Sequence, residues 1–192
     1  MPRRLIAVPI LHTAVDLGSL ADAVRDRYVR VLGPSAWTER ERTVDELWQA
    51  IRARVDALRL DYHAVLIYQD GLPVCGHELE IVRELAGAGS RNHQLILALI
   101  ERGATLMGTE DPQLLLREYQ MHRRSLGGAA AEPAAAPVPS AEAAELLELR
   151  DAFIAARIAE TLPSGQTGLL FLGAAHRWGA LVARGLNVET LS

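Results

Sequence analysis

The stretch LIAVPIL, residues 5–11, is an apolar run with no polar residue in it. Such a run is typical of a strand that is buried on both faces of a parallel sheet. Three later stretches share this character and predict further strands: AVLIY (64–68), ATLM (104–107) and TGLLFL (167–172). Residues 186–191 add a fifth candidate, at an edge of the sheet.

The segments between these stretches carry apolar residues at three- and four-residue spacing, which predicts helices. The expected helices cover residues 15–32, 38–60, 77–86, 91–102, 112–124, 140–162 and 175–184. Ser90 and Ser140 stand where N-terminal caps are expected. Alternation of strands and helices predicts an α/β fold, with a mostly parallel sheet of four to five strands and helices on both faces.

The chain of 192 residues fits one domain, and we expect residues 1–192 to form it. The segment 127–139, GGAAAEPAAAPVP, has no apolar periodicity, and we interpret it as a flexible linker inside the domain. No run reaches the roughly 18 apolar residues of a membrane helix, and the N-terminus resembles a strand more than a signal peptide. We therefore expect a cytoplasmic protein without a membrane partner.

The charged residues exclude several functions. The net charge is −4 and the 20 basic residues, all arginine, are scattered, which argues against a nucleic-acid partner. The absence of lysine excludes a phosphate-binding loop of the GKS/T type and a Schiff-base lysine. Cys75 is the single cysteine, so neither an intrachain disulfide nor a multi-cysteine metal site can form.

The residues that follow the predicted strands are imidazoles and carboxylates. His12, Asp70, Glu110 and His176 each stand at or just after a strand end. In parallel sheets ligands gather beyond these ends, and this donor set suits a divalent metal or acid–base chemistry. Asp70 precedes Gly71 and is also explained as part of a turn. His176 falls at the start of the expected helix 175–184, a position that favours anionic ligands.

Two further clusters of polar residues admit two interpretations each. Arg150 and Asp151 fall in the middle of the apolar side of the helix 140–162, where charges are costly unless paired. They either pair with nearby charges or reach solvent at the edge of this side, or they face a polar site. Arg91 and His93 lie in the first turn after Ser90, where they form either a solvated helix start or a substrate-binding group.

Two motifs resemble those of the TraB/TIKI/ChaN/erythromycin-esterase superfamily. One is RDxxIAxxI (150–158), and the other is GAAH (173–176) at the end of a strand. PILH (9–12) stands where the superfamily usually has a first Gly-x-x-His, here without the glycine, and Glu110 would supply an acid. The resemblance is strongest over residues 146–185 and implies a metal-dependent hydrolase or protease.

The leading hypothesis is a small hydrolase of ester or amide bonds, assisted by a divalent metal ion. His12, Glu110 and His176 would bind the metal or relay protons, Arg150 would hold an anionic group, and Asp151 would orient a histidine or Arg150. Asp70, Arg91 and His93 would contact the small-molecule substrate.

Two alternatives stand beside this hypothesis. The first is a non-catalytic protein that binds an anionic or heme-like small molecule on the same fold. The second is an interaction role, in which the helix 140–162 buries its apolar side on another copy and forms a homo-oligomer.

Overall fold

The computed structural model describes residues 3–13, 15–127 and 140–191. Most of the predicted linker 127–139 lies outside these ranges. Within them the elements are β1 (Arg4–Ile10), the 3-10 helix η1 (Val15–Leu20), α1 (Ala21–Leu32), α2 (Pro34–Ala57), the 3-10 turn η2 (Tyr62–Ala64), β2 (Val65–Gln69), α3 (Glu78–Gly87), α4 (Arg91–Glu101), β3 (Thr105–Met107), α5 (Pro112–Gly127), α6 (Ala141–Thr161), β4 (Thr167–Gly173), α7 (Gly179–Ala183) and β5 (Asn187–Thr190).

The five strands form one parallel sheet in the order β3-β2-β4-β1-β5. Strand β4 lies at its centre, where Ile10 of β1 pairs with Gly173 and Gln69 of β2 pairs with Phe171. All strands therefore end at the same edge. The predicted α/β fold is confirmed, and the described sheet is parallel throughout.

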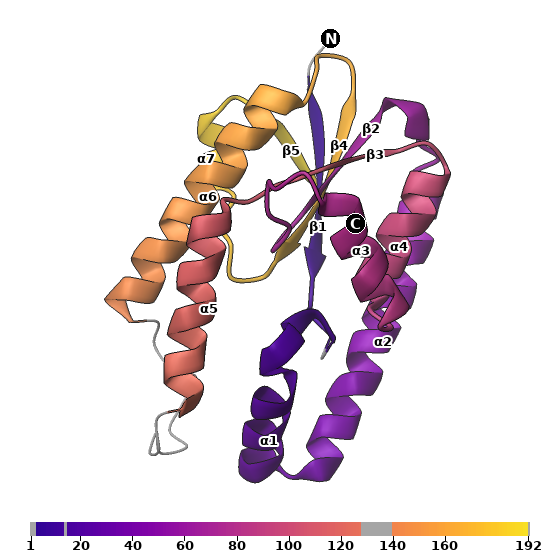
Figure 1. Ribbon diagram of the computed structural model, residues 1–192. Helices are drawn as coiled ribbons and strands as arrows, with labels where there is room; N and C mark the ends of the chain where they lie inside the picture. The colour runs from indigo at the N-terminus through magenta and orange to yellow at the C-terminus, as the bar shows by residue number, and fades with distance from the viewer. Residues whose placement is uncertain (1–2, 14, 128–139, 192) are drawn as a thin grey trace.

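Helices cover both faces of this sheet (Figure 1). Helices α2, α3 and α4 pack on one face, through buried side chains such as Trp48, Ile51 and Ile96. Helices α6 and α7 cover the other face, through Ile154 and Leu181 among others. Helix α1 packs along α2, and α5 packs along α6. Helix α1, the N-terminal half of α2 and part of α5 project beyond the edge where β1 ends (Figure 1).

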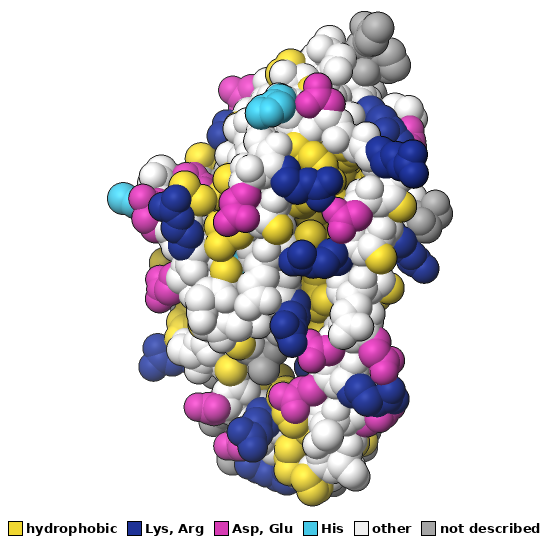
Figure 2. Space-filling view, turned by 90° about the vertical axis from the view of Figure 1, so that its right-hand side faces the viewer, with side chains coloured by type: hydrophobic (Ala, Val, Ile, Leu, Met, Phe, Trp, Pro, Cys, Tyr) yellow, Lys and Arg dark blue, Asp and Glu magenta, His cyan; other side chains and the backbone are white. Residues whose placement is uncertain are grey.

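The surface over α2 and α4 carries interspersed acidic and basic side chains (Figure 2). Two ion pairs join these helices: Arg91 to Asp45 at 3.0 Å and Arg102 to Asp56 at 2.5 Å. Among the described residues, no helix is long and apolar enough to cross a membrane.

Two predicted helices differ from the structure. The predicted helix 15–32 is not one continuous helix: residues 15–20 form the 3-10 helix η1, which is kinked at Gly18 (φ 53°, ψ −129°), and α1 begins at Ala21. The predicted helix 175–184 begins only at Gly179, so placing His176 at a helix start was wrong. His176 lies in the preceding turn, where its backbone N–H donates to the carbonyl of Gly173 at 3.2 Å.

Helix α6 buries its apolar side inside the chain. Ile154, Ala155 and Ile158 pack against the sheet, and Leu162, just after the helix, packs beside them. Ser140 caps the helix by accepting a hydrogen bond from the Ala143 N–H, as predicted. Most of this side therefore packs within the chain, whereas Leu149 of the same helix is 41 % exposed.

Candidate functional site

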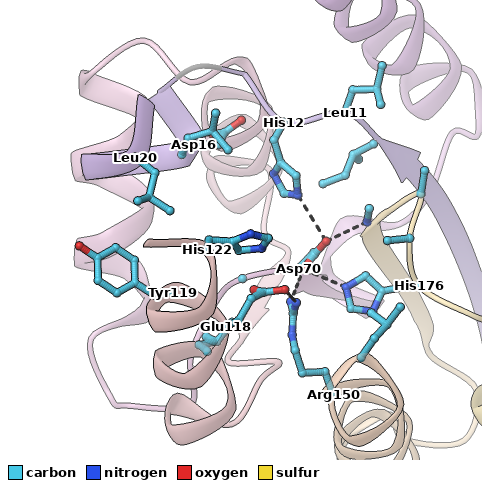
Figure 3. A pocket seen from close by; sticks show the side chains of 18 residues that line it. Leu11, His12, Asp16, Leu20, Asp70, Glu118, Tyr119, His122, Arg150 and His176 are labelled. Atoms are coloured by element: carbon cyan, nitrogen blue, oxygen red, sulfur yellow. Dashed lines mark hydrogen bonds and ion pairs between the residues drawn. The ribbon is translucent and has the colours of Figure 1, made fainter. Parts of the chain in front are cut away.

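Asp70, which directly follows β2, is the centre of a buried polar cluster (Figure 3). Its Oδ1 accepts a hydrogen bond from Arg150 Nη2 at 2.9 Å and lies 3.3 Å from His176 Nε2. Its Oδ2 accepts from the Gly173 backbone N–H at 2.9 Å and lies 3.4 Å from His12 Nε2. One carboxylate thus joins the ends of β1, β2 and β4 to helix α6.

Gly173 is required for this arrangement. A Cβ atom at this position would lie 2.6 Å from Asp70 Oδ2 and 3.5 Å from His12 Nε2. The first distance is far below van der Waals contact, so any larger residue would displace Asp70. The glycine of the GAAH motif therefore has a steric explanation in this chain.

The guanidinium of Arg150 binds three carboxylates. Its Nε donates to Glu110 Oε2 at 2.6 Å, and its Nη2 donates to Glu110 Oε1 at 2.7 Å as well as to Asp70. Its Nη1 donates to Glu118, on α5. Glu110 is completely buried and also accepts a hydrogen bond from the Gly71 backbone N–H at 2.7 Å. Arg150 therefore both pairs with charges and faces a polar site.

Asp151 binds His176 from the next position of α6. His176 Nδ1 and Asp151 Oδ1 lie 2.6 Å apart, and Asp151 Oδ2 accepts from the Arg177 backbone N–H at 3.0 Å. The imidazole is buried and lies between Asp151 and Asp70. This pair of contacts fixes the ring, with Nε2 directed at Asp70.

The cluster is rich in negative charge, which raises the pKa of its two histidines. Burial lowers the pKa of His176, but hydrogen bonds with Asp151 and Asp70 outweigh burial and raise it to about 9. Burial also lowers the pKa of His12, and its contact with Asp70 outweighs this and raises it. Burial raises the pKa of Glu110. The site therefore favours bound positive charge.

Three side chains of the cluster could hold a metal ion. One ligand atom each from Asp70, Glu110 and His176 lies within 4.8 Å of the others, and all three residues are buried. Glu110 and His176 are among the predicted ligands, whereas Asp70 was expected to contact the substrate. His12, the third predicted ligand, is not in this group; it lies beside it, bound to Asp70.

A pocket of about 380 Å³ opens beside the cluster, between η1 and α5 (Figure 3). His12, Asp70, Arg150 and His176 line its floor. The side chain of His12 is 36 % exposed, so it faces the pocket while remaining in contact with Asp70.

Helix α5 contributes Glu118, Tyr119 and His122 to this pocket, and sequence analysis missed all three. With Leu115 they recur at three- and four-residue steps and share one face of the helix. That spacing was readable in the sequence, but nothing in it showed that this face lies against a pocket.

Arg91 and His93, predicted to contact the substrate, are not among the residues that line this pocket. Arg91 pairs with Asp45 on the surface. His93 is buried, with its Nδ1 2.7 Å from Ser90 Oγ and 3.2 Å from Asp16 Oδ1. Ser90 caps α4 as predicted, so this second cluster fixes η1 to the start of α4.

Asp16 in this second cluster predicts a pH-dependent stability. Burial raises its pKa, but hydrogen bonds from His93, Ser90 and Thr13 outweigh burial and lower it below 3.8. A carboxylate whose pKa is lowered by folding stabilises the fold at a pH above its unfolded-state pKa. This stabilisation is lost as the pH falls through its folded-state pKa. We expect Asp16→Asn to have a lower free energy of unfolding than the unsubstituted protein at neutral pH. The gap between these two free energies is expected to shrink below pH 3.8.

Urea unfolding between neutral and acidic pH measures this gap. The matched control is Asp22→Asn, at an exposed carboxylate of α1. A gap for Asp16→Asn that stays constant down to the most acidic pH would contradict the prediction.

Comparison of the chain with protein-family models, with curated proteins and with solved structures gives no match. The geometry of the cluster and the chemistry of its residues are therefore the basis for inferring a function.

Proposed function

We propose that this protein is a small hydrolase of ester or amide bonds, assisted by a divalent metal ion. The observation that supports it most is the meeting of Asp70, Glu110 and His176. Asp70 and His176 line the floor of a pocket, beside the partly exposed His12, and Glu110 is buried behind them. The resemblance to the TraB/TIKI/ChaN/erythromycin-esterase superfamily supports the same proposal, because its two motifs supply Arg150, Asp151, Gly173 and His176 to this cluster.

The donor set fits a divalent ion. Two carboxylates and one imidazole are ligands that zinc, manganese and iron accept. Asp151 binds the second ring nitrogen of His176, and this contact to a metal-binding histidine is common in metal sites. The cluster contains four carboxylates and one permanent cation: Arg150 binds Asp70, Glu110 and Glu118, and Asp151 binds His176. Additional positive charge is therefore favoured here.

Arg150 and the proton of His176 compete with such an ion. Arg150 Nη2 lies 2.9 Å from Asp70 and 2.7 Å from Glu110, so it occupies the oxygens that an ion would use. Binding requires Arg150 to release part of this contact and His176 to be deprotonated. Since all three guanidinium nitrogens bind carboxylates, the role of Arg150 in this proposal is to position Asp70 and Glu110 rather than to bind an oxyanion.

A bound divalent ion would polarise the substrate carbonyl and lower the pKa of a water molecule. In the hydrolysis, the oxygen of water forms a bond to the acyl carbon, and the bond to the leaving oxygen or nitrogen breaks. One proton of the water passes to the leaving group, which departs as an alcohol or amine. His12 is placed to carry this proton, because its ring faces the pocket and Asp70 holds it at Nε2.

One feature favours a second function, non-catalytic binding of a small molecule. Arg150 already satisfies the carboxylates of Asp70, Glu110 and Glu118, so the cluster is complete without an ion. A protein of this kind would bind its ligand in the pocket and release it unchanged. Incubation with ester and amide substrates, followed by product analysis, separates the two functions.

The metal proposal predicts the effect of substituting Asp70. Zinc or manganese is expected to raise the unfolding temperature of the unsubstituted protein, because an ion that binds the folded state stabilises it. Asp70→Asn removes one charged ligand and is expected to weaken metal affinity by at least about tenfold. Titration calorimetry measures the affinity, and thermal unfolding measures the shift.

Asp45→Asn is the matched control for this substitution, since Asp45 is a half-exposed carboxylate paired with Arg91 away from the pocket. It is expected to keep the metal affinity of the unsubstituted protein. Equal affinities in the Asp70 and Asp45 variants would refute the metal site.

A further inference from the structure

Four leucines of the pocket wall lie outside both hydrophobic cores. Leu17 and Leu20 come from η1, Leu115 from α5 and Leu147 from α6, and all four line the pocket. None belongs to the apolar clusters that hold the helices on the sheet. Each is partly buried. Their apolar surface therefore faces the space of the pocket, where a ligand can cover it.

The pocket has two chemically different ends. Asp70, Arg150 and His176 lie at one end, and Leu20 and Tyr119 lie at the other (Figure 3). A ligand that spans the pocket therefore meets charged groups at one end and the side chains of Leu20 and Tyr119 at the other.

The size of the pocket limits the ligand. Its volume of about 380 Å³ is near the lower end of small-molecule sites, which run from about 300 to 1,000 Å³. The Ser19 hydroxyl and the Tyr119 hydroxyl lie 3.1 Å apart and join η1 to α5, the two walls of the pocket. Separation of these two walls to admit a bulkier ligand would break this bond.

We propose that the ligand is a small acyl compound whose aliphatic chain contacts these four leucines and whose polar head group lies at the end of the pocket formed by Asp70, Arg150 and His176. This inference rests on the proposed function for the identity of the reacting bond. The aliphatic chain of the ligand is inferred from the pocket itself, which has aliphatic walls, a polar floor and a small volume.

Binding of uncharged primary amides tests whether the pocket accepts an aliphatic chain, and it requires neither catalysis nor a metal ion. Acetamide, butanamide, hexanamide and octanamide are titrated into the protein, and affinity is followed by NMR. Each methylene that the leucines cover is expected to tighten binding about fourfold, until the chain fills the pocket. An affinity that does not change from acetamide to octanamide would overturn the proposal.

Two neighbouring leucines of α5 provide a matched pair of variants. Leu115 lines the pocket, whereas Leu116 is 49 % exposed and does not line it. Leu115→Gln is expected to weaken hexanamide binding about tenfold or more, and Leu116→Gln to leave it unchanged. Leu20→Gln, on the opposite wall, repeats the test if Leu115→Gln fails to fold. Equal binding by the folded pocket and surface variants would refute the proposal.

Hydrolysis assays separate this inference from the proposed function. If the protein binds long-chain amides more tightly but hydrolyses no ester or amide, the acyl pocket stands and the hydrolase does not. If it hydrolyses acetyl and hexanoyl esters with equal kcat/KM, the hydrolase stands and the acyl pocket does not.

Discussion

Replacing Arg150 with methionine is expected to lower the free energy of unfolding of the metal-free protein by about 3–5 kcal/mol. Arg150 is buried and binds Asp70, Glu110 and Glu118, so its removal leaves buried carboxylates without their cation. Removal of one partner from a buried ion pair has a cost of this size. Urea unfolding in the presence of a chelator measures it.

The same variant tests the competition between Arg150 and a metal ion. With the guanidinium absent, zinc is the cation that can neutralise Asp70 and Glu110, so it is expected to stabilise Arg150→Met more than the unsubstituted protein. Arg124→Met is the matched control, because Arg124 pairs with Glu142 on the surface and such pairs contribute about 1 kcal/mol or less. Equal stability of the two metal-free variants would contradict the central role of Arg150.

Replacing His12 with glutamine is expected to lower kcat/KM for the hydrolysed substrate by about a hundredfold to ten-thousandfold. A positioned group that transfers a proton in the transition state contributes a factor of this size. His12 lies outside the three candidate metal ligands, so its variant is expected to bind zinc as the unsubstituted protein does. Kinetic assays together with titration calorimetry check both results.

A comparison with two other histidines makes this test specific. His176→Gln is expected to lose both metal binding and activity, because His176 belongs to the group of three ligands. His77→Gln, at an exposed position just before α3, is expected to change neither. If His12→Gln lost zinc affinity along with activity, proton transfer would not be its separate role.

The strands and their common edge could be predicted because they depend on local patterns. The unbroken apolar runs identified β1, β2, β3 and β4, and the alternation with helices gave the parallel sheet. Because parallel strands end at the same edge of a sheet, the polar residues after them were expected to gather there. Arg150 and Asp151 stood on the apolar side of a predicted helix, which left open whether they reach solvent, and the structure buries both.

The partners of each residue could not be predicted, because they depend on the arrangement of distant segments. Asp70 looked like part of a turn, and it joins four groups because β4 brings Gly173 and His176 beside β2. Glu118 gave no signal, since its contact with Arg150 depends on the packing of α5 against α6. His93 showed the same first-turn pattern as Arg91 but is buried with Ser90 and Asp16.

The central position of β4 has a consequence for the order of folding. Strands β1 and β2 pair with β4 on its two sides and are not neighbours in the sheet. On a ribosome β1, β2 and β3 emerge long before β4 (Thr167–Gly173). The sheet therefore cannot be completed until this late segment inserts between β1 and β2. His176 follows β4 by three residues, so the polar cluster assembles in the same late step and is present only in chains that have completed the sheet.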